Sequence, residues 1–267
     1  MRFRVSHESV YQYDVPVRPG EHLVRLTPRP QGVGVLSHQL SIEPEPSSRS
    51  DEVDSSGNVL TRVRFAGETR LLRFRSRFEL DTLPVSELLA GTFPLPATQM
   101  GGTPIHPDVR ALASRIAGEV GGDTVAFLDR LSQVLFTRME RHIRPTGDAR
   151  PAHETLALGS GACRDLTVLF VDTCAAVGLL GRFVSGYQAS AQTPDGQRHL
   201  HAWGEVLLPG VGYRGWDPMH GVRVLDGHVA LFAAPTQPQT MPVEGSFTFV
   251  GTTVNTTLDN EVRIATD

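Results

Sequence analysis

The stretch that decides the fold is Gly159-Ser160-Gly161-Ala162-Cys163-Arg164-Asp165-Leu166-Thr167, a glycine-punctuated loop that runs into an apolar helix. Beyond the loop, apolar or small residues recur at the spacing of one buried helix face, namely Leu166, Leu169, Phe170, Thr173 and Val177. Ser160 is a capable cap before this run, and Gly178 follows its last member. The pattern predicts a buried helix from about Ala162 to Val177, with Cys163 in its first turn.

The position of Cys163 allows two interpretations. Unpaired N–H groups and the dipole at a helix start favour negative charge, which promotes the thiolate form and makes the residue a candidate nucleophile. A lone cysteine is also commonly an inert core residue. The second cysteine, Cys174, lies three turns farther along almost the same face and is predicted to be core. About 16 Å of helix separates the two Cα atoms, so they cannot form a disulfide, and free thiols suit a reducing compartment.

Composition sets broad limits on the class of protein. The chain has 267 residues, 40% of them hydrophobic, which is enough for one large domain or two modest ones. Its net charge of −4 gives no basic footprint for a nucleic-acid partner. No apolar run reaches the ~18 residues that span a bilayer, and the first residues contain no signal-peptide core. We therefore expect a cytoplasmic protein with neither a nucleic acid nor a membrane as partner.

The first 85 or so residues predict short strands separated by turn residues. Ser55-Ser56-Gly57-Asn58 lies between two strand-like runs and is a hairpin signal, since Gly and Asn tolerate positive φ. The clearest strand alternates Leu72, Phe74, Phe78 and Leu80 with Arg73, Arg75 and Arg77. We predict an antiparallel β-sandwich domain over residues 1–90, with the arginine row as a solvated face rather than an anion site.

A second domain is predicted after a linker at residues 91–107, where glycines and prolines block regular structure. One short helix carries Val109, Leu112, Ala113 and Ile116, and a second begins at a cap formed by Asp123 or Thr124. Residues 136–155 are predicted to form a loop. The fold class is thus α+β, with helices packed on an antiparallel sheet over residues 108–267. The last strands, at about 245–264, are expected to pack back on the β-domain.

The strand from His199 to Leu208 is the second informative stretch, because one face of it carries His199, His201, Trp203 and Glu205. Pro209-Gly210-Val211-Gly212 then turns the chain toward Asp217. If the loop has three residues, Leu208 pairs with Gly212, and Asp217 becomes the diagonal neighbour of His201. A slip of one residue would put Asp217 on the opposite face, so the register tests this interpretation.

A cysteine at a helix start, a histidine on a strand and an aspartate on the next strand suit nucleophilic catalysis. Cys163 would attack an acyl carbon, His201 would hold the thiolate and shuttle its proton, and Asp217 would fix the imidazole tautomer. A metal site is the competing interpretation, since His199 and His201 have a spacing that can seat a metal on a strand. Its third ligand would be His220 or Asp217, and the thiol would be the fourth.

Three motifs resemble the core of the bacterial transglutaminase-like proteins: Gly161-Ala162-Cys163-Arg164-Asp165, His201-Ala202-Trp203-Gly204-Glu205-Val206 and Trp216-Asp217-Pro218. Val184-Ser185-Gly186-Tyr187 fits the same pattern, and Tyr11-Gln12-Tyr13, Leu26-Thr27-Pro28-Arg29 and Gly57-Asn58 resemble the amino-terminal β-domain of one bacterial branch. The resemblance implies a papain-like core with a triad of Cys163, His201 and Asp217. The chain departs from the family pattern at Met219-His220 and at residues 233–242, which bears on the choice of substrate.

Several neighbours of the implied triad have candidate roles. The Cys163 backbone N–H is a natural oxyanion donor, and Arg164 and Asp165 are expected to orient the loop as an ion pair. A substrate groove would be lined by Trp203, Trp216 and Tyr187, although aromatic residues at such positions also serve as core.

The residues and the resemblance together predict cysteine-dependent chemistry on an amide or peptide bond through a thioester on Cys163. The substrate would be a peptide or protein amide, and no metal or other cofactor is expected. Peptidase or amidase activity is favoured over amine transfer, because water is always available and no dedicated amine site is evident in the sequence. The alternative is a non-catalytic binding or scaffolding protein.

Overall fold

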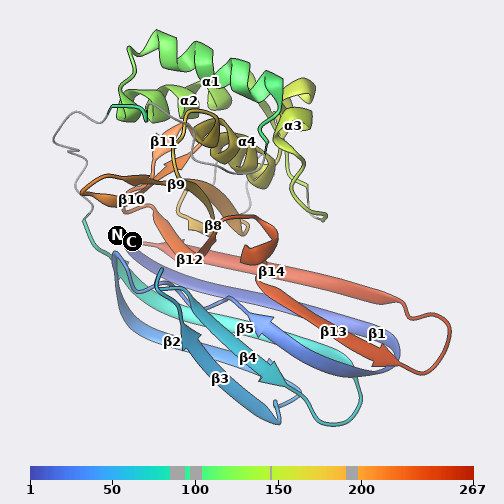
Figure 1. The fold of residues 1–267 in the computed structure, drawn as a ribbon. Helices are drawn as coiled ribbons and strands as arrows, with labels where there is room; N and C mark the ends of the chain where they lie inside the picture. Colours follow the sequence, from blue (N-terminus) through green and yellow to red (C-terminus); the bar gives the residue numbers. More distant parts are fainter. Residues whose placement is uncertain (85–93, 97–103, 145, 191–197) are drawn as a thin grey trace.

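The computed structural model describes residues 1–84, 94–96, 104–144, 146–190 and 198–267. Figure 1 shows three layers: a sheet of long strands, a smaller sheet in the middle, and the helices on the opposite side. Most of the predicted linker at residues 91–107 lies outside the described residues.

The long-stranded sheet is organised around β1 (Arg2–Val24), a single strand where the sequence suggested several short ones. Its first half pairs with β5 (Thr69–Thr82) and β14 (Thr256–Thr266), and its second half pairs with β4 (Val59–Arg64) and β13 (Val243–Phe249). β2 (Val33–Glu43) lies beside β5, and β3 (Ser48–Val53) lies beside β4. The two halves face each other, since His22 stacks on Phe74 at 5.9 Å between ring centroids.

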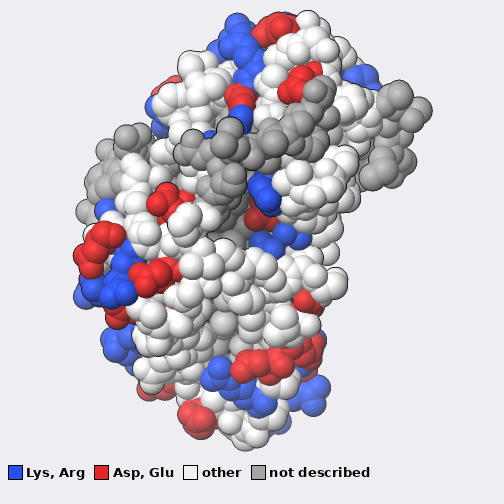
Figure 2. Space-filling model, turned by 90° about the vertical axis from the view of Figure 1, so that its left-hand side faces the viewer, with Lys and Arg blue, Asp and Glu red and all other residues white. Residues whose placement is uncertain are grey.

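The predicted hairpin and amphipathic strand are confirmed in this sheet. β3 and β4 pair antiparallel on either side of the turn, where Gly57 has a φ of 74°. In β5, the predicted apolar residues are buried, and Arg73 and Arg75 form ion pairs with Glu8 on β1. Figure 2 shows basic and acidic side chains interspersed on one face of the molecule rather than gathered into a patch of one sign.

Both predicted helices are confirmed. α1 (Pro107–Glu119) and α2 (Thr124–Arg138) follow each other, and the Asp123 carboxylate accepts from the Ala126 N–H as the cap of α2. The prediction of a loop over residues 136–155 is wrong in part. That region contains β6 (Glu140–Arg141), which pairs with β7 (Ser160–Gly161), and the start of α3 (Ala152–Leu158). These elements are too short to show a hydrophobic period.

The middle sheet is antiparallel, with strand order β11-β10-β9-β8-β12. Its strands are β8 (Gly181–Gln188), β9 (His201–Leu208), β10 (Gly212–Asp217), β11 (Val222–Arg223) and β12 (His228–Ala234), followed by the short 3-10 helix η1 (Pro238–Thr240). α4 (Cys163–Ala176) packs on one face of this sheet, as Val206 and Leu208 share a core with Leu166 and Phe170. On the other face, Tyr187, Val229 and Leu231 join the core of the long-stranded sheet.

Specific hydrogen bonds join the two sheets. The Asn58 side-chain amide donates to the Ala233 carbonyl at 2.7 Å and accepts from the Ala233 N–H at 2.8 Å. The Arg29 N–H donates to the Ala230 carbonyl at 2.9 Å. The amino-terminal sheet therefore holds β12 by its backbone.

Among the described residues, no helix has the length and apolarity needed to cross a membrane.

Candidate active site

Cys163 opens helix α4, close to the predicted start, and is half-buried. The extended residue Ala162 precedes it, with φ −79° and ψ 169°. The backbone N–H of Cys163 is among the first of the helix and has no acceptor one turn earlier within the helix. The sequence therefore puts the thiol where helix N–H groups and the positive end of the dipole favour an anion.

Asp165 fixes the loop in front of this helix. Its carboxylate has no exposed surface and accepts from the Ala162 N–H at 2.9 Å and the Arg150 N–H at 2.8 Å. The expected ion pair with Arg164 is wrong, because Asp165 pairs with Arg144 at 2.5 Å. Arg164 instead donates to the Thr146 carbonyl at 2.7 Å. The capping role expected of Ser160 is likewise taken by Asp165, since Ser160 belongs to β7.

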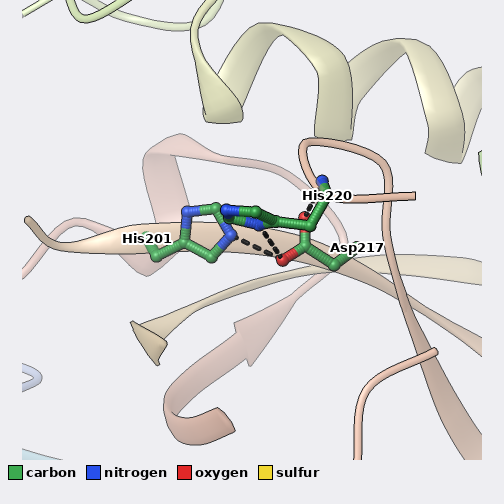
Figure 3. A group of neighbouring side chains, drawn as sticks. All are labelled: His201, Asp217 and His220. Carbon is green, nitrogen blue, oxygen red and sulfur yellow. Dashed lines mark hydrogen bonds and ion pairs between the residues drawn. The ribbon is translucent and has the colours of Figure 1, made fainter. Parts of the chain in front are cut away.

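His201 begins β9, and the predicted hairpin register is confirmed. Gly212 pairs with Leu208 and Trp216 with Gly204, so Asp217 follows on the face that carries His201. The His201 Nε2 lies 2.8 Å from the Asp217 Oδ2 (Figure 3). The imidazole also interacts with the Cys163 thiol, whose hydrogen bond and charge raise the pKa of His201. The three residues predicted from distant motifs therefore form one continuous chain of contacts.

Charge and burial act in opposite directions on the pKa values of His201 and Asp217. Burial lowers the pKa of His201, but the Asp217 carboxylate and the Cys163 sulfur overcome it and raise this pKa from 6.5 to about 10. Burial likewise raises the pKa of Asp217, but its contacts with the surrounding imidazoles hold it well below the ordinary value. The site therefore favours an imidazolium beside an ionised carboxylate at neutral pH.

Asp217 accepts more hydrogen bonds than the sequence pattern predicts. Besides the His201 nitrogen, Oδ2 lies 2.8 Å from Nδ1 of His220 and 3.0 Å from Nε2 of His228. Oδ1 accepts from the backbone N–H groups of Met219 at 2.9 Å and His220 at 3.3 Å. Sequence reasoning named His220 only as a metal ligand, and it gave His228 no role.

Only some of the residues predicted as metal ligands lie close together in the structure. Within the described residues, the cluster with metal-ligand geometry consists of His201, Asp217 and His220, whose ligand atoms lie within 4.8 Å of one another, and His199 is not in it. The contacts of Asp217 with both imidazoles are 2.8 Å long. Two ligands of a tetrahedral zinc would lie about 3.3 Å apart at zinc–ligand distances near 2.0 Å. The observed separations are those of N–H···O hydrogen bonds.

The three candidate groove residues lie in hydrophobic cores. Tyr187 and Trp216 are 0% and 1% exposed, and they bond to His7 and Asp129, respectively, at 2.8 Å. Side chains without exposed surface cannot line a groove, so this prediction is wrong for both. Trp203 is also 1% exposed, so the groove prediction is wrong for it as well, although its ring centroid lies 6.3 Å from that of His201.

Comparison with known families matches most of the chain. Residues 3–81 match the family model of the bacterial transglutaminase-like N-terminal region. Residues 110–219 match the model of the transglutaminase-like superfamily. Cys163, His201 and Asp217 all lie within the second match.

The chain is also similar to individual proteins over most of its length. An uncharacterized protein of Mycobacterium tuberculosis is 24% identical over 241 residues, which are 78% of this chain and 74% of the relative. One from Mycobacterium leprae is 22% identical over 275 residues, covering 94% and 95% of the two chains. The crystal structure of a candidate cysteine protease from Cytophaga hutchinsonii has a TM-score of 0.73 at 17% identity, over 99% of this chain and 90% of that one. The predicted α+β fold is therefore confirmed.

Proposed function

The chain belongs to the transglutaminase-like superfamily and carries its bacterial N-terminal region, and on this premise we propose that it is a cysteine-dependent enzyme acting on amide or peptide bonds. The observation that supports the proposal is the contact chain from the Cys163 thiol through the His201 imidazole to the Asp217 carboxylate. In that chain Nε2 of the imidazole faces the carboxylate, which leaves Nδ1 for the thiol and for the proton it exchanges.

The proposed reaction begins from a thiolate on Cys163 and an imidazolium on His201. The sulfur attacks the carbonyl carbon of the amide, and the Cys163 backbone N–H donates to the oxygen that becomes negative. The carbon–nitrogen bond breaks as His201 gives its Nδ1 proton to the leaving amine, and an acyl thioester remains on the sulfur. Asp217 stays ionised throughout and stabilises the imidazolium.

The thioester is then resolved by a second nucleophile. A water molecule gives its proton to the neutral His201 and attacks the thioester, releasing the acid and restoring the thiolate and imidazolium. A primary amine in place of water would give transfer instead of hydrolysis. We favour peptidase or amidase activity, since water needs no binding site of its own and the same residues serve both routes.

A screen of peptide and glutamine amides, with and without an added primary amine, tests the proposal. We expect Cys163→Ala to lower amide cleavage by at least about 10³-fold. Cys174→Ala is the matched control, because this thiol is fully buried in the core and lies outside the contact chain. Amide cleavage by the Cys163→Ala variant at the wild-type rate would refute the proposal.

Iodoacetamide labelling provides an assay that needs no substrate. Burial raises the pKa of the Cys174 thiol, so it should resist alkylation. We expect rapid labelling confined to Cys163 and persisting at mildly acidic pH. Equal and slow labelling of both cysteines would favour a non-catalytic protein instead.

A further inference from the structure

Three imidazoles converge on one carboxylate oxygen in this site. Asp217 Oδ2 lies 2.8 Å from the His201 and His220 nitrogens and 3.0 Å from the His228 nitrogen. The proposed reaction uses His201 alone, so two buried imidazoles have no role in it. An ionised carboxylate can only accept hydrogen bonds, so the ring nitrogens that face it carry protons.

The second ring nitrogen of His220 and of His228 bears on which nitrogen of each ring carries the proton. Nε2 of His220 and Nδ1 of His228 are buried and have no hydrogen-bond partner within the described parts of the chain. A proton on either nitrogen would be a buried donor without an acceptor. Burial also lowers the pKa of His228, which keeps that ring neutral. Both rings thus turn a protonated nitrogen toward Asp217, as Figure 3 shows for His220.

The two donors come from different parts of the fold. His220 lies in the turn after β10, where the Asp217 carbonyl accepts from the Gly221 N–H at 2.8 Å. His228 begins β12, beyond β8, and its ring packs edge-on against Trp203 with 5.2 Å between centroids. The Trp203 ring crosses Gly186, where a Cβ would overlap the indole. The donors are therefore held in place by separate elements.

We propose that His220 and His228 are positioning residues that keep the Asp217 carboxylate ionised and turned toward His201. This proposal rests on the proposed function, in which His201 needs an anion behind it. Asp217 has no exposed surface, so protein groups must replace the water that would otherwise solvate its charge. Without the two donors, the carboxylate turns away or takes up a proton, and His201 loses its hold on the Cys163 thiolate.

Isosteric substitutions separate hydrogen bonding from packing. In His220→Asn, the side-chain amide nitrogen occupies the place of Nδ1 and can still donate to Asp217, although the smaller side chain leaves a void. In His220→Leu the volume is kept and the donor is lost. We expect the leucine variant to lose at least about tenfold in kcat with KM little changed, as for other partners that orient a working histidine. We expect the asparagine variant to retain most of kcat. A packing role predicts the opposite order.

The same comparison at position 228 uses His228→Gln, whose amide nitrogen matches Nε2, against His228→Met. Thermal unfolding checks that each variant is folded. If the leucine or methionine variant does not fold, the amide variants still decide, because a tenfold loss of kcat in both His220→Asn and His228→Gln would overturn the proposal.

The rate of iodoacetamide alkylation of Cys163 at mildly acidic pH distinguishes a failure of this proposal from a failure of the proposed function. We expect alkylation to slow in the leucine and methionine variants and to stay fast in the amide variants. Fast labelling in the wild type with no amide cleaved would refute the proposed function and leave the positioning role standing. Equal labelling rates in all four variants would refute the positioning role.

Discussion

Removing the charge of Asp217 is the most direct test of the electrostatics of the site. Burial alone lowers the pKa of His201, whereas the carboxylate, together with Cys163, raises it from 6.5 to about 10. A difference of this size corresponds to on the order of 5 kcal/mol in favour of the imidazolium. In Asp217→Asn the side chain keeps its shape and loses its charge. We therefore expect the pKa of His201 to fall well below its wild-type value in the variant, because Cys163 alone then offsets burial.

The assay follows the rate at which iodoacetamide alkylates Cys163 as a function of pH. In the wild type, the His201 imidazolium persists from acidic pH to about 10, so a positive charge lies beside the Cys163 sulfur at about pH 6. In Asp217→Asn that positive charge is lost at lower pH, so alkylation of Cys163 in mild acid should slow. We expect the rate at about pH 6 to fall at least about tenfold and the two proteins to converge near pH 10.

Asp129→Asn is the matched control for this measurement. Asp129 is also an acidic residue beside β10, where it accepts from the Trp216 Nε1 at 2.8 Å and pairs with Arg223. It belongs to a different cluster of contacts, so its replacement should leave the alkylation profile as in the wild type. An Asp217→Asn variant that keeps the wild-type rate in mild acid would show that Asp217 does not support the imidazolium.

Three further predictions concern stability. The His201–Asp217 pair should stabilise the fold fully between about pH 4 and 6.5. This contribution is lost as the pH rises toward 10 and His201 deprotonates, or as the pH falls far enough to protonate Asp217. The difference in melting temperature between the wild type and Asp217→Asn should therefore shrink toward both extremes of pH. Asp165→Asn should lower the free energy of unfolding by about 3 kcal/mol in urea titrations, because it leaves Arg144 without its buried partner. Gly186→Ala should lower the melting temperature by several degrees, since its Cβ would overlap a backbone carbonyl of β12, and a variant as stable as the wild type would contradict the described packing.

The parts of the site that the sequence predicts are those set by local geometry. The helix start at Cys163 follows from the glycines before it and the apolar period after it. The position of Asp217 beside His201 follows from a three-residue loop, which fixes the register of a hairpin. Each of these depends on a short segment and its own periodicity, so reasoning from residues reaches them.

The missed features depend on contacts between distant elements. His228 reaches Asp217 only because β12 lies beside β8 and β8 beside β9, an order that no local pattern reveals. The groove prediction failed for Tyr187 and Trp216 because both faces of the middle sheet are covered, one by helices and one by the amino-terminal sheet. Alternation of residue types along a strand separates its two faces, but it does not reveal that both faces are covered by other parts of the protein.

These contacts also give the amino-terminal sheet a physical role in the site. Among the described residues, β12 is an edge strand of the middle sheet and pairs there with β8. Its backbone is held from the other side by Arg29 and by the Asn58 amide. Because β12 carries His228, any shift of the strand would move a donor away from the Asp217 carboxylate, 3.0 Å distant. The amino-terminal sheet therefore supports the geometry of the candidate site through β12, although it supplies none of the three residues of the proposed triad.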